Sequence, residues 1–137
     1  MKTKHLLAVA LVTTLCTLSP ARAQTPTIET MAPVVVKTVP EAGTDNVAPG
    51  VVEIKVTFSK EMADESWTWS NAWKDSVPET IGKPRYEADR KTCVLKVKLE
   101  PNKTYAYWLN SQKFTGFRDT GGRAAVPYLL SFKTKGK

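Results

Sequence analysis

Three tryptophans lie close together in the middle of the chain and are the strongest candidates for a binding site. They are Trp67, Trp69 and Trp73, and they stand among serine, threonine and asparagine residues. Residues two apart in a β-strand share one face, so Trp67 and Trp69 would present their indole rings side by side. Exposed indoles can stack on a sugar ring or contact a protein partner, whereas buried indoles fill a hydrophobic core. These three alternatives remain open.

Polar neighbours could orient sugar hydroxyls, and a fourth tryptophan could extend the same surface. The polar candidates are Asp64, Glu65, Ser70 and Asn71. Trp108 alternates with Tyr107 and Leu109 along an expected strand, so one of the two faces of that strand must be partly exposed. Trp108 is placed to cover the edge of the tryptophan cluster. The predicted partner contacts are therefore Trp67, Trp69, Trp73 and Trp108. The predicted partner is an unidentified protein or an envelope glycan.

Catalysis has little support in this sequence. The one histidine, His5, lies in a segment that we expect to be removed. Without it the chain cannot form a Ser-His-Asp or Cys-His arrangement, or a histidine-ligated zinc or copper site. A glycosidase needs two carboxylates about 5–10 Å apart. Carboxylates do cluster in sequence at Glu61, Asp64, Glu65 and Asp75, but such clusters are common on solvated loops. We therefore expect a protein that is not an enzyme and holds no cofactor or metal.

The start of the chain predicts a secretory signal peptide. Basic residues precede an apolar stretch over residues 6–18, and Pro-Ala-Arg-Ala-Gln at 20–24 offers a cleavage site after Ala23. The apolar stretch would make about 20 Å of helix, short of the ~30 Å hydrocarbon core. Lipidation of Cys16 is disfavoured because Leu15, and not a small residue, precedes it. The predicted location is periplasmic or extracellular, with no stable membrane span after cleavage.

Removal of residues 1–23 leaves 114 of the 137 residues, enough for one domain with its own core. Because Lys2, Lys4 and Arg22 are lost, the formal net charge falls from +7 to +4. The remaining lysines are scattered, so nucleic-acid binding is not supported. Residues 24–32 have little to bury and predict a flexible leader, and residues 33–135 predict the folded domain.

Alternating apolar and polar residues predict about seven β-strands. The clearest alternation places Val52, Ile54, Val56 and Phe58 on one side of a strand over residues 51–59. The other strands are expected over residues 33–37, 65–73, 83–87, 90–99, 104–110 and 126–134. Turn residues separate them, and beyond the signal peptide no segment has a sustained helical period. This pattern is typical of a Greek-key β-sandwich.

Three residues are predicted to have structural roles: Phe58, Cys93 and Tyr105. Phe58 lies on the apolar side of its strand. Cys93 alternates in phase with the apolar residues of its strand, where a small buried thiol is expected, and without Cys16 no intramolecular disulfide can form. Tyr105 is placed to act as a tyrosine corner, with its ring in the core and its hydroxyl bonded to upstream backbone.

Four motifs occur in the order and spacing of a known family. They are the turn over residues 39–47, the strand and bend over 54–62, the Leu-Glu-Pro-Asn-Lys-Thr-Tyr run over 99–105, and the final hairpin from 119–122 to 132–134. Together they resemble the bacterial Ig-like domain of S-layer and other surface proteins. The resemblance covers residues 33–134 and says least about the tryptophan segment.

The resemblance implies a surface, interaction or accessory role on an Ig-like sandwich. With the signal peptide, it predicts a non-catalytic secreted or periplasmic module for protein interaction. A small carbohydrate-binding module that uses Trp67, Trp69 and Trp73 is the alternative. Because sandwiches of this kind commonly bury a tryptophan, we expect one or two of these rings in the core.

Overall fold

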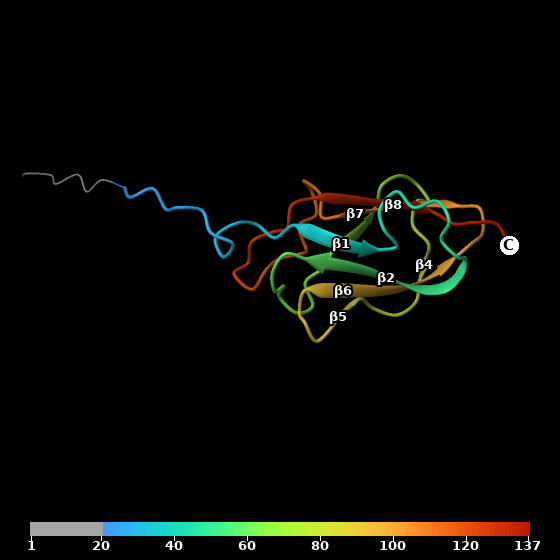
Figure 1. Cartoon of the computed structure of the whole chain (residues 1–137), viewed down its shortest axis with the longest axis horizontal. Coiled ribbons are helices and arrows are strands. Elements are labelled where there is room, and N and C mark those ends of the chain that lie inside the picture. The colour runs from blue at the N-terminus through green and yellow to red at the C-terminus, as the bar shows by residue number, and fades with distance from the viewer. Residues whose placement is uncertain (1–20) are drawn as a thin grey trace, which may run out of the picture.

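Residues 21–137 are described by the computed structural model, and within this range the chain forms eight β-strands and no helix (Figure 1). The strands are β1 (Val35–Val39), β2 (Gly50–Phe58), β3 (Trp69–Asn71), β4 (Glu79–Thr80), β5 (Arg85–Tyr86), β6 (Thr92–Leu99), β7 (Thr104–Leu109) and β8 (Tyr128–Lys133). The prediction of an all-β protein is confirmed. Nothing between residues 21 and 137 has the length and apolar character of a membrane-spanning helix.

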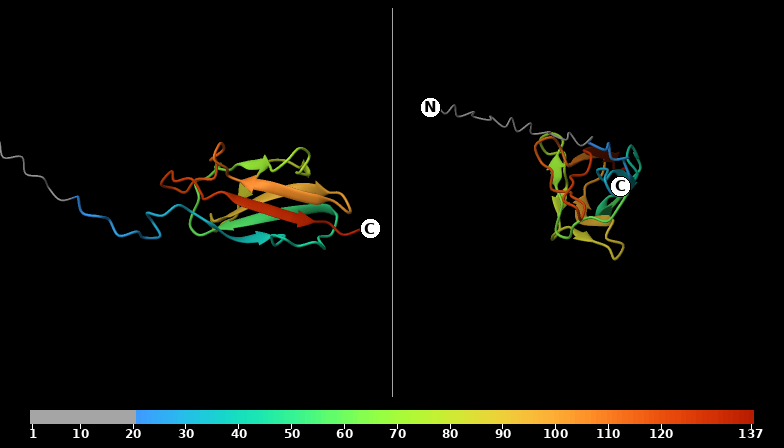
Figure 2. Two further views of the ribbon diagram at one scale, coloured as in Figure 1. Left: turned by 90° about the horizontal axis from the view of Figure 1, so that it is seen from above. Right: turned by 90° about the vertical axis from the view of Figure 1, so that its left-hand side faces the viewer.

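The strands make two antiparallel sheets stacked face to face (Figure 2). The larger sheet has the order β1-β2-β6-β4, with β5 also paired to β6, and the smaller has the order β3-β7-β8. A constant-type Ig sandwich likewise joins its first, second, fifth and fourth strands in one sheet and its third, sixth and seventh in the other. The predicted Ig-like sandwich is therefore confirmed.

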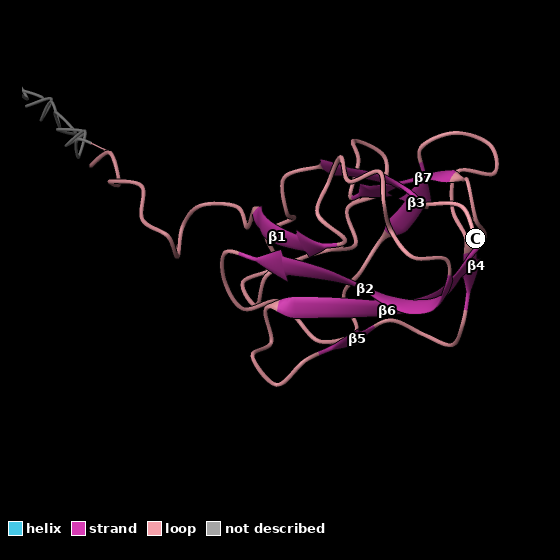
Figure 3. Cartoon of the chain, turned by 45° about the vertical axis from the view of Figure 1, so that its right-hand side comes forward, coloured by secondary structure: helices cyan, strands magenta, loops and turns pink. Residues whose placement is uncertain are grey.

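One interrupted strand accounts for the difference between about seven predicted strands and the eight observed. β4 and β5 both pair with the edge of β6 that β2 leaves open (Figure 3). Together they take the place of the fourth strand of an Ig domain. The strand predicted over residues 83–87 corresponds to β5, whereas β4 was not predicted because two polar residues show no alternation.

Alternation along the long strands builds the core, as the sequence predicted for these segments. In β2, Ile54, Val56 and Phe58 are buried. Glu53 lies on the opposite face of the strand and is exposed. The facing strands contribute Cys93, Leu95, Val97 and Leu99 of β6, Tyr105, Tyr107 and Leu109 of β7, and Leu130 and Phe132 of β8. The ring of Phe58 lies 5.0 Å from that of Phe117, which joins the β7–β8 loop to the core.

The strand predicted over residues 65–73 is wrong in its extent, because only Trp69–Asn71 pairs. Glu65 has a φ of 54°, a left-handed conformation that an extended strand excludes. Just before β3, the side chains of Ser66 and Thr68 hydrogen-bond to the backbone of Gly116 instead of leaving the segment free to pair as a strand. The tryptophans therefore lie in a loop and at the start of a short strand.

Residues 21–32 are exposed and extend away from the sandwich (Figure 1). The predicted signal peptide over residues 1–23 lies almost entirely outside the described residues. Its cleavage after Ala23, the flexibility of residues 24–32 and the domain boundaries at 33 and 135 stay predictions.

Candidate functional site

Trp69 packs into the interior of the sandwich from β3. Its ring meets that of Tyr107 edge-on, with centroids 5.3 Å apart and an interplanar angle of 81°, and it lies 5.7 Å from the ring of Phe117. Tyr107 is two residues after Tyr105 on β7, which is where many Ig domains place the disulfide cysteine that packs on a core tryptophan. Trp69 therefore occupies the position of the core tryptophan of an Ig sandwich.

Trp67 lies beside Trp69 and is also partly buried. Its ring centroid is 6.4 Å from that of Tyr86 on β5. The two tryptophans share a cavity of about 390 Å³, here called the tryptophan cleft, lined by Trp67, Thr68, Trp69, Val77, Thr80, Pro84, Leu95 and Tyr107. The cleft lies where β3, at the edge of one sheet, faces the interrupted β4 and β5 of the other. The structure thus brings together Trp67 and Trp69 in one open cleft.

Trp73 and Trp108 lie outside this cleft. Trp73 is 50% exposed in the turn after β3, where its backbone N–H lies 3.3 Å from the hydroxyl oxygen of Ser76. Trp108 is on β7, next in sequence to the inward-facing Tyr107, and so lies on the outer face of the smaller sheet. Trp108 is therefore on the other side of β7 from the cleft that Trp67 and Trp69 share.

The outer face of β7 and β8 carries an apolar surface, here called the Trp108 face, made of Trp108, Pro127 and Leu129. Trp108 pairs directly with Leu129 across the two strands. Leu129 is 42% exposed and Trp108 is half-buried, and Phe114, in the loop between the two strands, is 49% exposed. A shallow hollow of about 480 Å³ is lined by Trp108, Ser111, Gln112, Lys113 and Pro127. Lys113 is the only charged residue in this lining.

Sequence reasoning did not assign Leu129 or Phe114 to a site. A signal for Leu129 was present, because the alternation of 126–134 puts Leu129 on the solvent side with Ser131 and Lys133. A large apolar residue on the polar side of a strand is a departure from the pattern expected of a one-sided sheet. Phe114 lies in an irregular loop, where no periodicity could indicate its exposure.

Asn110 fixes the base of the loop that carries Phe114. It is fully buried with a φ of 58°. Its side-chain amide donates to the carbonyl oxygens of Phe117 and Ala125 at 2.9 and 3.0 Å, and its side-chain oxygen accepts from the N–H of Phe117 at 2.8 Å. These three bonds join both arms of the β7–β8 loop beside the Trp108 face, so the loop has a defined path.

Asp119 holds the tip of the same loop against the bend after β2. Its buried carboxylate accepts from the backbone N–H groups of Gly121 and Arg123 and lies 2.7 Å from Nζ of Lys60. Burial alone raises the pKa of Asp119, but the hydrogen bond from Lys60 and those from Arg123 and Gly121 outweigh it and hold the pKa below its ordinary value. The carboxylate is a structural clamp.

The residues predicted to be structural lie in the core. Phe58, Cys93 and Tyr105 are each no more than 1% exposed. The hydroxyl of Tyr105 accepts a hydrogen bond of 2.9 Å from the N–H of Glu100, the upstream bond that a tyrosine corner makes. Burial raises the pKa of the Cys93 thiol to about 12, against a smaller opposing effect of Trp69. A protonated, buried thiol is a poor nucleophile.

Of the carboxylates considered for catalysis, Asp64 lines a hollow of about 270 Å³ together with Glu87 and Arg90, whereas Glu61, Glu65 and Asp75 are not part of that lining. Asp64 accepts a hydrogen bond from the adjacent backbone N–H of Glu65, and Glu61 pairs with Arg90 at 3.6 Å on the surface. Asp75 lies in the turn after β3 with a φ of 61°. Within residues 21–137 no three histidine, cysteine or acidic side chains lie close enough together to hold a metal ion.

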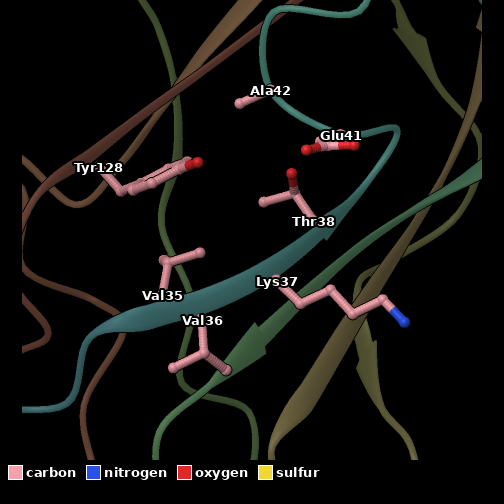
Figure 4. Close-up of a pocket in the computed structure, with 7 residues that line it drawn as sticks. All are labelled: Val35, Val36, Lys37, Thr38, Glu41, Ala42 and Tyr128. Carbon is pink, nitrogen blue, oxygen red and sulfur yellow. The ribbon is translucent and has the colours of Figure 1, made fainter.

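A further cavity, of about 350 Å³, lies between β1 and the start of β8 (Figure 4). It is lined by Val35, Val36, Lys37, Thr38, Glu41, Ala42 and Tyr128. Backbone hydrogen bonds from Val126 to Pro33 and from Gly43 to Ser131 tie the first and last strands together along this seam. It belongs to the junction of the two sheets, and none of the predicted contact residues lines it.

Comparison with protein families agrees with the Ig-like strand order. Searches of curated proteins and of solved structures found no match. A family model described as a bacterial Ig-like domain matches residues 29–134. That span includes all eight strands, the tyrosine corner and both tryptophan-bearing surfaces. The chain belongs to the bacterial Ig-like domain family.

Proposed function

We propose that this domain is a non-catalytic interaction module of the bacterial cell envelope, periplasmic or extracellular, and that it binds a protein partner through the Trp108 face. The observation that carries the proposal is the exposed apolar surface on the outer side of β7 and β8. An antiparallel sheet with one face in the core usually has a polar outer face. Trp108 and Leu129 depart from that pattern at paired positions.

The composition of the Trp108 face suits a protein partner. Aromatic residues are enriched where protein interfaces bind most strongly, and charged residues are depleted at interface centres. Trp108 is flanked by Leu129 and Pro127, with Lys113 at the rim of the hollow. Asn110 anchors the loop beside it, which lowers the ordering cost of binding.

The carbohydrate alternative has less support. A stacking platform needs exposed and roughly coplanar rings, but Trp69 is engaged edge-on with Tyr107 and Trp73 lies outside the cleft that Trp67 and Trp69 share. The separation of the rings therefore favours the protein-interaction role over the glycan role.

The test is capture of partners from the native cell envelope by the tagged protein, by a Trp108→Ala variant and by a Trp73→Ala control. Loss of a central tryptophan typically costs at least 2 kcal/mol of binding, or about 30-fold in affinity. We expect the partner recovered by the wild type to be lost with Trp108→Ala and retained with Trp73→Ala. Equal recovery by both variants, with both folded by their melting curves, would show that the Trp108 face is not the interface.

A further inference from the structure

Charge is unevenly distributed between the two parts of the domain sequence. Residues 101–137, which contain β7, β8 and the loop between them, have seven basic residues and one acidic residue, whereas residues 24–100 have ten basic and twelve acidic residues. The formal net charge is therefore +6 for the first of these parts and −2 for the second. The one acidic residue, Asp119, is buried and paired with Lys60. Every exposed side-chain charge from 101 to 137 is consequently positive.

Two of these cations stand at the two ends of the Trp108 face. Lys133 lies opposite Thr104, the first residue of β7, and Leu129 lies opposite Trp108. Lys133 and Leu129 are four residues apart on one strand, so they share the outer face with about 13 Å between their Cα atoms. Lys113 follows the other end of β7 and lines the hollow beside Trp108. The apolar centre of the face therefore lies between two lysines.

Neither lysine has a carboxylate partner among residues 21–137. Both side chains are exposed, and neither takes part in an ion pair within this range. Nζ of Lys113 lies 5.3 Å from the centre of the Phe114 ring. Asp45 follows Thr44, whose carbonyl oxygen accepts the backbone N–H of Lys133, yet Asp45 forms no ion pair with that lysine. Both ammonium groups are thus available to an outside anion.

The outer face of the larger sheet has the opposite character. There Glu53 pairs with Arg85 and Glu87 pairs with Lys55, so positive and negative side chains neutralise one another. The Trp108 face has cations at its ends without such compensation. Since binding surfaces are arranged so that their potentials are complementary, the partner of this face is expected to be negatively charged.

The shape of the apolar centre distinguishes a protein from a lipid surface. An aromatic side chain that binds a membrane must reach about 5–10 Å into the boundary between headgroups and acyl chains. Trp108 is half-buried and lines a hollow of about 480 Å³. A hollow receives a side chain from its partner, and an apolar anchor inside a charged rim is the usual arrangement of a protein interface.

We propose that the Trp108 face binds an acidic protein segment, with one apolar side chain in the hollow beside Trp108 and carboxylates on either side that pair with Lys113 and Lys133. This inference rests on the proposed function and adds the chemistry of the partner to it. Exposed ion pairs of this kind each contribute about 1.5- to 5-fold to affinity at low ionic strength.

The first test is a titration of the ¹⁵N-labelled protein with the acetylated peptide amide Glu-Glu-Glu-Phe-Glu-Glu-Glu, followed by the indole N–H signals of its four tryptophans. We expect a saturable shift of the Trp108 signal, with Trp67, Trp69 and Trp73 as internal controls, and weaker binding as the ionic strength rises from about 0.01 M to 0.15 M. The matched peptide with glutamine in place of glutamate should bind more weakly. No saturation by the acidic peptide, or equal affinity for the two peptides, would overturn the proposal. Sedimentation with phosphatidylglycerol vesicles that Trp108→Ala abolishes would assign the face to lipid and overturn it as well.

Lysine variants test the two ends of the face separately. Lys113→Gln and Lys133→Gln are each expected to weaken binding of the acidic peptide by about 1.5- to 5-fold. Lys96→Gln removes the same charge from an exposed position on the larger sheet and should leave the affinity unchanged. Equal affinities in the three variants would show that net charge alone matters and would contradict the assigned contacts.

A photo-crosslink separates this inference from the proposed function. p-Benzoylphenylalanine in place of Leu129 should give a protein adduct in the native cell envelope, and the double variant Lys113→Glu/Lys133→Glu should lose most of that adduct. An adduct of equal yield in both proteins would keep the protein-binding role and overturn the acidic partner. Absence of any protein adduct would overturn the proposed function itself.

Discussion

Trp69 and Tyr107 meet at the centre of the sandwich, where many Ig domains have a tryptophan packed on an inter-sheet disulfide. This chain has no such disulfide among its described residues, where Cys93 is a free thiol. Aromatic packing between β3 and β7 takes over part of that role, since edge-to-face pairs stabilise by about 0.5–1.5 kcal/mol beyond their burial. Of the four predicted tryptophans, Trp67 and Trp69 thus line one cleft, whereas Trp73 and Trp108 lie outside it.

The reactivity of Cys93 follows from its burial. Its pKa is raised from 9 to about 12, so at pH 8 the thiolate fraction is about a thousandfold lower in the folded protein than in the unfolded chain. We expect Ellman's reagent to label the processed protein at least a hundredfold more slowly in buffer than in guanidinium chloride. Rapid labelling of one thiol in buffer would show that Cys93 is accessible or that Cys16 has not been removed.

The same raised pKa makes stability depend on pH in the alkaline range. The folded pKa exceeds the unfolded one, so this contribution is complete below pH 9 and is lost as the pH rises toward 12. A Cys93→Ala variant lacks the titrating group. Its free energy of unfolding should fall less steeply than that of the wild type between pH 9 and 11.

At the scale of elements, Asp119 connects parts of the chain that are far apart in sequence. Lys60 follows β2, whereas Gly121 and Arg123 belong to the β7–β8 loop, and the carboxylate bonds to all three. Replacement by asparagine leaves Lys60 without its partner in a largely buried setting. We expect Asp119→Asn to lower the free energy of unfolding at pH 7 by about 2–3 kcal/mol.

The contribution of Asp119 to the free energy of unfolding decreases as the pH is lowered. Because the folded pKa of Asp119 lies below its ordinary value of 3.8, its contribution is present above pH 3.8 and is lost as the pH falls through the folded pKa. Urea unfolding at pH 7 and pH 3 measures this, with Arg123→Ala as the control for the longer, 3.7 Å pair, whose Arg123 side chain is 44% exposed. An Asp119→Asn variant as stable as the wild type at pH 7 would mean that the clamp contributes nothing.

How much of the fold could be predicted depended on the length of each strand. The long strands β2, β6 and β8 alternate over six or more residues, because one face is buried, and burial leaves a pattern in the sequence. β3 and β4 span three and two residues and leave no such pattern. The break between β4 and β5, which opens the tryptophan cleft, is for this reason invisible in the sequence.

The candidate site was predictable only in part. Aromatic residues could be recognised as candidates by type, and Trp67 and Trp69 do lie together. Which face each ring takes depends on contacts made across the sandwich, such as those of Trp69 with Phe117, a residue 48 positions further along the chain. The exposure of Leu129 and Phe114 likewise depends on the path of the β7–β8 loop, which Asn110 fixes through bonds to Phe117 and Ala125.

At the scale of the whole molecule, the sandwich presents two separate surfaces on a conventional Ig scaffold. The Trp108 face is apolar and carries a shallow hollow, with Lys113 as the charged residue of its lining, whereas the lining of the tryptophan cleft is uncharged. They lie on opposite sides of the smaller sheet, because neighbouring residues of β7 alternate between its faces.

The most direct test of the proposed function places p-benzoylphenylalanine at single positions of the protein in its native cell envelope. Leu129 samples the Trp108 face, and Val51, which is 55% exposed on the larger sheet, is the matched apolar control. Irradiation should give a discrete adduct with another protein from position 129 and none from position 51. No adduct from position 129, or equal adducts from both positions, would contradict a protein-binding role for the Trp108 face.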